Sequence, residues 1–289
     1  MLLSEFLASD YKEQHFVVVL GHPVSHSRSP AIHNAAMSYH NLNVRYYALD
    51  CPEREQHLIP ELFALHNFRG ANVTIPLKKK ITSFLDDSDE SARDIGAVNT
   101  VVPDLQTGQL FGYNTDAYGF MVPLRENFNI RTATILGTGG ASRAICYALL
   151  KHGVEKLYLV SRKQKKQVLE FDRPTQLHRI TYNDLGYAIM HSELIVNCTP
   201  VGMHPETEHS PIPDSLMPLL AGKYCYDIIY NPPETTLLQK AKANKALTID
   251  GLDMFIHQAA RSFEMWFGKP MPIDLARNVL LDMIKKSRS

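Results

Sequence analysis

The sequence feature that most constrains the fold is the glycine-rich turn GTGGAS at residues 137–142. It follows the strand-like segment TATILG and precedes a segment that we expect to be a helix ending at Gly153. Gly137 permits a tight turn, and Gly139 lets a pyrophosphate approach the backbone at the positive end of the helix. Ser142 stands where the usual fingerprint has a third glycine. This setting predicts a dinucleotide site; the alternative is a tight turn without a ligand.

The end of the next expected strand, KLYLVSR, indicates which dinucleotide binds. It reads Ser161-Arg162-Lys163, and Lys165 and Lys166 follow closely. An NAD site has Asp or Glu here to accept a hydrogen bond from the ribose 2′-hydroxyl, whereas the 2′-phosphate of NADP attracts basic side chains. These residues therefore predict NADP rather than NAD. The alternative is that they form a solvated surface loop.

Strands and helices also alternate in the first part of the chain. The expected strands are FVVVL (16–20), VRYYALD (44–50) and GANVTI (70–75). We expect helices over 53–66 and from about residue 77, and another that starts with Ser29 as N-cap and Pro30 in its first turn. Such alternation predicts an α/β unit with a largely parallel sheet.

After residue 96 the pattern changes, because AVNTVVP and QLFGYN predict two short paired strands. A helix over about 115–127 leads into the glycine-rich unit. At the C-terminus, apolar residues at helical spacing predict helices. We expect these helices to return to the first domain, although the spacing alone does not require it. We therefore expect a two-domain α/β protein. Residues 1–115 plus 255–289 form a substrate-binding and catalytic domain with a mostly parallel sheet, and residues 116–254 form a Rossmann-type NADP domain.

Composition narrows the class of protein. The 289 residues are 45% hydrophobic and 21% charged with a formal net charge of +0, which gives no indication of a nucleic-acid or membrane partner. The four cysteines form no CxxC pair, and the sequence shows neither a signal peptide nor an apolar run of about 20 residues. We expect a cytoplasmic protein, because this cysteine pattern fits a reducing compartment. We expect no metal site, because the close histidine pairs lie in loops that contain proline.

Polar side chains gather where the expected strands of the first domain end. Ser25, Ser27 and Ser29 follow the first strand at the mouth of a helix, where hydroxyls suit a carboxylate or sugar-like hydroxyls. Ligands of α/β sheets collect beyond the carboxyl ends of strands. Several such ends here offer hydrogen-bonding side chains, so we expect a polyhydroxylated small-molecule substrate. The other candidates at such ends are Asn72, Thr74, Lys78, Asn99 and Asp116.

Eight segments spread over nearly the whole chain carry a resemblance to a known family. They are SHSRSP (25–30), NVTIPLK (72–78), GAVNT (96–100), GYNTDAYG (112–119), GTGGASRA (137–144), NCTPVGM (197–203), DIIYNPPETTLL (227–238) and GLDMFIHQAARSFEMWFG (251–268). In these segments, which occur in the family's order, the sequence resembles the shikimate dehydrogenase family. The resemblance implies reversible NADPH-dependent reduction of 3-dehydroshikimate to shikimate, on the route to chorismate and the aromatic amino acids.

The resemblance also implies roles for single residues. Lys78 and Asp116 match the family's catalytic pair, and we expect Lys78 to be the acid/base and Asp116 its orienting partner. In contrast, Lys79 and Lys80 are expected to be solvated helix surface. The residues implied for substrate binding are Ser27, Ser29, Thr74, Asn99, Asp116, Tyr230 and Gln258, with the two serines on the carboxylate. Those implied for the cofactor are Glu90, Gly137, Thr138, Gly139, Gly140, Ala141, Ser161, Arg162, Lys163, Lys166, Ile228 and Gly251.

Some positions depart from the family's pattern. Ser161 and Lys163 replace the residues of a common Asn-Arg-Thr segment, and Cys198 and Pro200 replace smaller residues. Quinate-preferring relatives tend to have Thr at the position of Ser29, so this serine favours shikimate. The alternatives are a quinate/shikimate dehydrogenase that uses NAD, a folate-linked dehydrogenase and a non-catalytic NADP-binding sensor. Family members include monomers and dimers, so a homodimer stays open.

Overall fold

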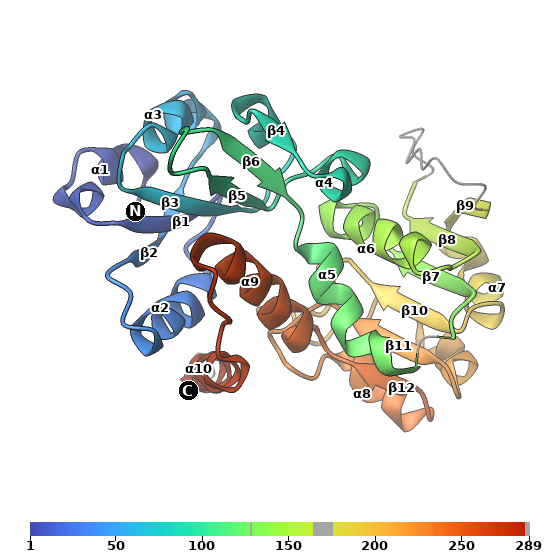
Figure 1. Ribbon diagram of the computed structural model, residues 1–289. Helices are drawn as coiled ribbons and strands as arrows, with labels where there is room; N and C mark the ends of the chain where they lie inside the picture. The colour runs from blue at the N-terminus through green and yellow to red at the C-terminus, as the bar shows by residue number, and fades with distance from the viewer. Residues whose placement is uncertain (128, 164–175, 287–289) are drawn as a thin grey trace. The chain divides into compact units, whose positions relative to one another are not determined.

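The apolar runs of the N-terminal part form the strands of a six-stranded sheet in the computed structural model, which describes residues 1–127, 129–163 and 176–286 (Figure 1). The chain divides into two units, Met1–Thr115 with Ile256–Ser289, and Asp116–Phe255. Lys166, which was expected to bind the cofactor, lies outside the described residues. No helix in the described part of the chain is long and apolar enough to cross a membrane.

The sheet of the first unit is parallel at its centre and antiparallel beyond it. β1 pairs in parallel with β2 and β3, whereas β5 is antiparallel to β3 and β6. The carboxyl ends of β1, β2 and β3 therefore meet the amino end of β5 at one edge of the sheet. The strand order is β2 (Arg45–Asp50), β1 (Phe16–Gly21), β3 (Phe68–Val73), β5 (Thr100–Pro103), β6 (Leu110–Tyr113) and β4 (Asp87–Ser88).

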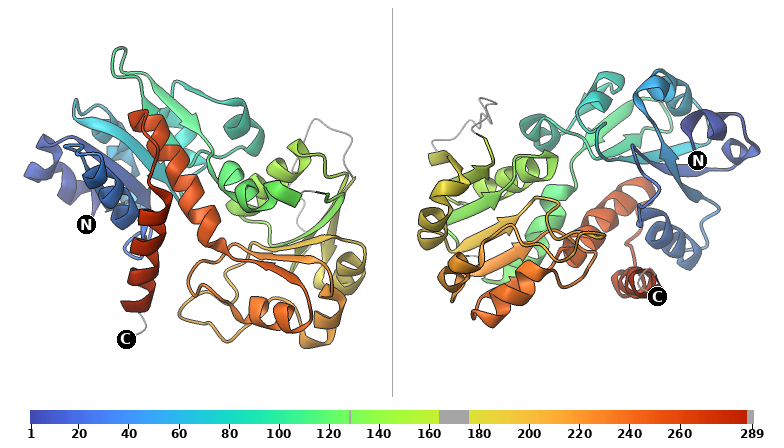
Figure 2. Two further views of the ribbon diagram at one scale, coloured as in Figure 1. Left: turned by 60° about the horizontal axis from the view of Figure 1, so that its bottom comes forward. Right: turned by 180° about the vertical axis from the view of Figure 1, so that it is seen from behind.

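Helices cover both faces of this sheet. On one face, Phe16, Val18 and Leu20 of β1 pack in a core with α1 (Leu3–Leu7) and α3 (Ile59–Phe63). On the opposite face lie α2 (Ser29–Tyr39) and α10 (Ile273–Lys286), which pack against each other (Figures 1 and 2). The expected return of the C-terminal helices to the first unit is therefore confirmed. The remaining helix before the second unit is α4 (Glu90–Ile95).

Helix α9 (Gly251–Phe267) approaches this sheet closely through one tryptophan. A Cβ added to Gly70 of β3 would lie 2.2 Å from Trp266 Nε1, so the indole occupies the space that a side chain would need. Trp266 Nε1 donates a hydrogen bond to the Val101 carbonyl at 2.9 Å. The glycine inside β3 is thus explained by close packing of a helix onto the strand.

The second unit contains a fully parallel sheet. Its order is β12 (Leu247–Ile249), β11 (Tyr224–Asp227), β10 (Leu194–Asn197), β7 (Thr132–Leu136), β8 (Lys156–Ser161) and β9 (Gln176–Thr181). This is the strand order of a Rossmann fold, in which the chain reverses direction across the sheet between β7 and β10. The helices of the unit are α5 (Asp116–Met121), α6 (Gly140–Lys151), α7 (Leu185–Met190) and α8 (Thr236–Ala243). The predicted two-domain α/β class is confirmed.

Two expected helices are shorter than predicted because prolines interrupt them. The segment 53–66 forms a 3₁₀ helix, Glu53–Leu58, followed by α3, in whose first turn Pro60 lies. The segment 115–127 forms α5 and then a 3₁₀ helix, Val122–Asn127, which contains Pro123. Proline has no amide hydrogen for the helical ladder, so each chain segment restarts or tightens at that residue.

Two further predictions near the polar edge were wrong. Ser29 is the first residue of α2 and Arg28 is the N-cap, so Ser29 does not cap the helix. No α-helix follows β3: residues 75–79 form turns and a 3₁₀ helix covers Lys80–Phe84. The Lys78 carbonyl instead accepts a hydrogen bond from the Val98 amide at 2.8 Å. A partner distant in sequence therefore replaces the helical one.

A buried histidine should make the stability of the first unit depend on pH. His33 is 0% exposed, stacks on Tyr46 at 4.5 Å, and has no hydrogen-bond partner for either ring nitrogen among the described residues. Burial lowers the pKa of His33 to about 3 from an ordinary 6.5. Between pH 6.5 and about 3 the unfolded chain binds a proton that the folded protein does not. The free energy of unfolding therefore decreases by about 1.4 kcal/mol for each unit by which the pH is lowered in this window.

His33→Leu should remove this dependence. We expect urea unfolding of the wild type and the variant between pH 4 and 7 to show a smaller loss of stability on acidification in the variant. Comparing the two slopes separates protonation from any change in packing, because packing shifts both ends of the curve together. Equal slopes would contradict the buried neutral imidazole.

Candidate active site

The loops after β1 and β3 are joined at the polar edge of the first sheet. The His22 amide donates to the Ile75 carbonyl at 2.9 Å, and the Thr74 amide donates to the Leu20 carbonyl at 2.8 Å. A Cβ on Gly21 would lie 2.3 Å from Thr74 Cγ2, so the two segments touch closely. The loop after β1, residues 22–28, is called the serine loop, and the segment after β3, residues 74–80, is called the lysine loop. The two loops are therefore in direct contact.

The three lysines of the lysine loop differ in exposure. Lys78 is partly buried, whereas Lys79 and Lys80 are exposed. The Lys78 backbone is held by the hydrogen bond from Val98, the residue that precedes Asn99. The Lys78 backbone is thus bound to the segment just before β5 that also carries Asn99.

Asn99 connects this region to the start of α5. Its backbone amide donates to the Tyr113 carbonyl at 3.0 Å. Its Oδ1 accepts from the Thr115 amide at 2.8 Å, and its Nδ2 donates to Thr115 Oγ1 at 3.1 Å. Asp116 follows Thr115 directly in the chain. The backbone at Lys78 and the residue before Asp116 are therefore held by the adjacent residues Val98 and Asn99.

Asn72 was expected to face a ligand together with Thr74, but it serves the core instead. Its side chain is buried, accepts from the Tyr46 hydroxyl at 2.7 Å, and donates to Ser262 Oγ at 3.0 Å. Thr74 lies one residue beyond the end of β3, so the alternation of a strand does not apply to the pair. Asn72 thus links the sheet to α9.

The serine loop presents its hydroxyls at the first turn of α2. Ser27 Oγ accepts a hydrogen bond from the Ser29 amide at 3.3 Å, and the Ser27 amide donates to the Val24 carbonyl at 3.0 Å. Ser29 is buried, Ser27 is partly buried and Ser25 is exposed. α2 has 11 residues, so the positive end of its dipole favours an anion beside these serines.

The glycine-rich turn lies where the Rossmann sheet reverses direction. Gly137 has a φ of 100°, which favours glycine, and its amide donates to the Val160 carbonyl at 2.9 Å. A Cβ there would lie 3.1 Å from Thr199 Cγ2 in the loop after β10, the strand that pairs with β7. At Gly139 and Gly140 an added Cβ would meet no described atom within 4 Å. This open space above the start of α6 fits a pyrophosphate.

The basic residues lie beside this turn. Val160 pairs with Leu136, so the end of β8 is next to the end of β7. Ser161 Oγ donates to the Lys163 carbonyl at 2.7 Å and closes a tight turn, in which Arg162 and Lys163 are exposed. An exposed cationic pair at this place fits the 2′-phosphate of NADP.

A buried carboxylate, that of Asp227, lies at the carboxyl ends of β10 and β11, next to the point where the sheet reverses direction. Asp227 Oδ1 accepts from Asn197 Nδ2 at 3.0 Å and from the Ile229 amide at 3.1 Å, and Oδ2 accepts from Thr235 Oγ1 at 2.8 Å. Asn197 Oδ1 in turn accepts from the Thr199 amide at 2.9 Å. Burial raises the pKa of the Asp227 carboxyl to about 6, against the effect of its three donors. Asp227 thus fixes the loops after β10 and β11.

The remaining predicted residues are divided between the units. In the second unit, Tyr230 stacks on Phe255 at 4.4 Å, and an added Cβ at Gly251 would lie 2.2 Å from the Ile228 carbonyl oxygen. Gly251 is therefore required by close packing of α9 onto the loop after β11. In the first unit, the Gln258 carbonyl accepts from Ser262 Oγ at 3.1 Å.

Glu90 is the remaining predicted cofactor residue, and no metal site was expected. Glu90 is exposed at the start of α4 in the first unit, whereas the other candidate cofactor residues belong to the second. Within the described ranges, no group of three or more His, Cys, Asp or Glu side chains is arranged to hold a metal ion.

Comparisons with known proteins show the family to which the chain is similar. The profile of the "Shikimate dehydrogenase substrate binding domain" matches residues 19–101, and that of the "Shikimate 5'-dehydrogenase C-terminal domain" matches residues 251–281. The chain is 41% identical over 276 residues to "Shikimate dehydrogenase (NADP(+))" of Symbiobacterium thermophilum, covering 91% of this chain and 92% of the relative. The chain belongs to the shikimate dehydrogenase family.

Solved structures of the family have the same fold. The shikimate 5-dehydrogenase of Listeria monocytogenes, crystallised with shikimate and NAD, superposes with a TM-score of 0.84 at 31% identity, covering 93% of this chain and 96% of that one. The enzyme of Thermus thermophilus, in complex with NADP(H) and shikimate, gives 0.79 at 33% identity, covering 92% and 98%. The family resemblance is therefore confirmed in sequence and in structure.

Three residues with several side-chain hydrogen bonds were not singled out from the sequence. Thr115 Oγ1 and Ser262 Oγ are hydrogen-bonded to each other at 3.3 Å, Thr115 also bonds to Asn99, and Asp227 accepts three hydrogen bonds. All three did lie in segments quoted for the family, namely GYNTDAYG, GLDMFIHQAARSFEMWFG and DIIYNPPETTLL. Polar residues inside otherwise apolar strand ends are the signal that indicates such positions, because a buried polar group needs partners.

Asp227→Ala should destabilise the protein by about 2–4 kcal/mol, because it leaves three buried donors without an acceptor. Asp227→Asn retains the shape and the Oδ1 acceptor, so its stability should be close to that of the wild type at pH 7. The raised pKa makes the folded state bind the proton more tightly than the unfolded state between pH 3.8 and about 6. As pH falls through this window, the free energy of unfolding of the wild type should therefore increase relative to that of the Asn variant.

Thermal unfolding of the three proteins at pH 4.5 and 7 measures both effects. The prediction fails if the Ala and Asn variants lose equal stability, since the missing acceptor would then be unimportant.

Proposed function

We propose that the protein catalyses the reversible NADP-dependent reduction of 3-dehydroshikimate to shikimate, a step in the biosynthesis of aromatic amino acids. The observation that carries the proposal is the hydrogen-bonded frame at residues 98–99, which holds the backbone of Lys78 and the residue before Asp116. This frame occurs in a chain that is 41% identical, over most of its length, to a relative named shikimate dehydrogenase.

The reaction needs a hydride at the carbonyl carbon and a proton at its oxygen. When bound, NADPH supplies the hydride. We assign the proton at the oxygen to the Lys78 ammonium group and the orientation of that group to Asp116. Ser27 and Ser29 would hold the substrate carboxylate at the positive end of α2, and Thr74, Asn99, Tyr230 and Gln258 would contact the ring hydroxyls. In the reverse direction Lys78 takes the proton from the shikimate hydroxyl.

We also propose that the two domains divide the work. Residues 1–115 with 255–289 would bind substrate, and residues 116–254 would bind NADP through the glycine-rich turn, Ser161, Arg162 and Lys163. The support is that the serine and lysine loops belong to the first unit and the glycine-rich turn to the second. A cytoplasmic location is proposed as well, because Cys51, Cys146, Cys198 and Cys225 are free thiols, as in a reducing compartment.

One assay tests the activity and the cofactor together. Purified protein with shikimate and NADP should raise the absorbance at 340 nm, and quinate or NAD in place of either partner should give a lower kcat/KM. No turnover with either substrate would favour a non-catalytic NADP-binding protein. Faster turnover with quinate and NAD would support the alternative enzyme.

Arg162→Ala tests the basis of the cofactor preference. The loss of a charge-assisted contact to the 2′-phosphate should raise the KM for NADP by about one to two decades. The KM for NAD, which lacks this phosphate, provides the control within the same variant and should not change. Equal changes with both cofactors would mean that Arg162 acts through the fold of the loop.

Lys78→Ala tests the acid/base assignment, because removal of a positioned proton donor should lower kcat by about 10²–10⁴-fold with a small change in the KM for shikimate. Lys79→Ala and Lys80→Ala are matched controls from the same run and should keep wild-type kcat, because their side chains are exposed. A Lys78→Ala enzyme with near-normal kcat would refute the assignment.

A further inference from the structure

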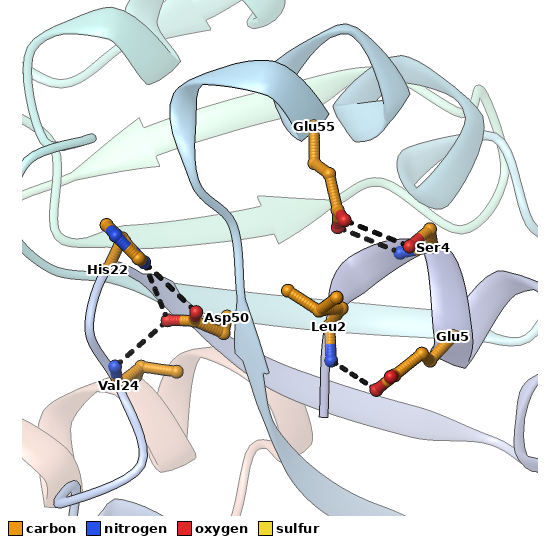
Figure 3. Close-up of polar contacts among 7 residues, drawn as sticks. All are labelled: Leu2, Ser4, Glu5, His22, Val24, Asp50 and Glu55. Atoms are coloured by element: carbon orange, nitrogen blue, oxygen red, sulfur yellow. Dashed lines mark hydrogen bonds and ion pairs between the residues drawn. The ribbon is translucent and has the colours of Figure 1, made fainter.

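The loop between β1 and α2 is anchored by a residue of a neighbouring strand. Asp50 is the last residue of β2 and pairs in register with Gly21, the last residue of β1. Its carboxylate lies 3.0 and 3.1 Å from Nδ1 of His22 and accepts from the Val24 amide at 3.2 Å (Figure 3). Asp50 therefore binds both the ring and the backbone at the start of the serine loop.

The anchoring extends to the serines through two further hydrogen bonds. The Val24 carbonyl accepts from the Ser27 amide at 3.0 Å, and Ser27 Oγ accepts from the Ser29 amide at 3.3 Å. The Val24 side chain is buried at 2% exposure, so this point of the loop is also held by packing. Three linked hydrogen bonds thus lead from the Asp50 carboxylate to both serine residues.

We propose that Asp50 is a positioning residue for the substrate carboxylate, acting through Val24 and His22 on the hydroxyls of Ser27 and Ser29. The proposal rests on the function proposed above, in which these serines bind that carboxylate. A hydroxyl binds a carboxylate more tightly when its own position is already fixed. A mobile loop must be ordered at each binding event, and this ordering costs binding free energy. The Asp50 anchor provides this order before the substrate arrives.

The charge of Asp50 explains why it is paired with His22. An acidic group near an anion site opposes the binding of the anion, and N–H donors that point at its oxygens reduce this opposition. Here the His22 ring and the Val24 amide both donate to the carboxylate, and the side chain of Asp50 is 27% exposed. The same two contacts that fix the loop therefore also occupy the oxygens of Asp50.

A second carboxylate nearby provides a matched control. Glu55 accepts from the amide of Ser4 at 3.1 Å and from its hydroxyl at 3.0 Å, and so holds the start of α1 (Figure 3). Asp50 and Glu55 both anchor a segment that is distant in sequence. Of the two, Asp50 anchors the segment that leads to the serines. Loss of either should affect folding stability, and loss of Asp50 alone should affect the substrate.

The experiment measures steady-state kinetics of Asp50→Ala, Asp50→Asn and Glu55→Ala alongside the wild type. Asp50→Ala should raise the KM for shikimate about tenfold or more and leave the KM for NADP unchanged, because a charge-assisted anchor is lost on the substrate side alone. Asp50→Asn retains an oxygen for the Val24 amide and should recover most of the affinity. Glu55→Ala should keep the wild-type KM for shikimate.

Shikimate methyl ester provides a readout that a general loss of structure would not move. The ester lacks the carboxylate charge, so the wild-type and Asp50→Ala enzymes should differ by less than about twofold with it. If Asp50→Ala does not fold, His22→Ala removes the ring contact alone and should raise the KM for shikimate by several fold, again without effect on the ester.

Three results would overturn the proposal. They are an unchanged KM for shikimate in Asp50→Ala, an equal loss with shikimate and its methyl ester, and an equal rise in Glu55→Ala. A wild-type enzyme that turns over shikimate while Asp50→Ala behaves normally refutes only the role of Asp50. A wild-type protein that does not turn over shikimate refutes the proposed function itself.

Discussion

The hydrogen bonds of Asn99 are the interaction on which the rest of the candidate site depends. Its backbone carbonyl accepts from the Val73 amide at 2.8 Å, and its side chain holds Thr115. These bonds bring the end of β3, the lysine loop and the residue before Asp116 to one point. Lys78 and Asp116 are 38 residues apart in the numbering of the chain. The Asn99 side chain thus joins segments of the first unit that are distant in sequence.

The two units position their loops by the same physical means. In the first, buried Asn72 and Asn99 accept and donate bonds at the edge of the mixed sheet. In the second, buried Asn197 and Asp227 do so where the parallel sheet reverses direction. Satisfied polar groups in a region of low dielectric have few alternative arrangements, so they specify one loop conformation. The backbone of the glycine-rich turn is then left open toward a ligand.

The parts of the fold that could be predicted from the sequence are those set by local patterns. FVVVL and TATIL are β-branched runs whose burial requires a covered sheet, and the turn after TATIL needs a positive φ at Gly137. The chain after β3 could not be predicted, because the bond from Val98 to Lys78 joins segments 20 residues apart. Asp50 and Asp227 were missed as anchors for the same reason, since their partners lie on other strands or loops.

The chemistry of each anchor follows from the neighbours that it must satisfy. Asp227 is surrounded by two N–H donors and a hydroxyl, so a carboxylate with acceptor oxygens alone suits it despite the cost of burial. Asn99 faces the amide and the hydroxyl of Thr115, and its side chain offers both an acceptor and a donor to them. A carboxylate at position 99 would lack the donor and would add a buried charge beside Thr115, the residue that precedes Asp116. Each loop therefore sets which acceptors and donors the side chain at the strand end must provide.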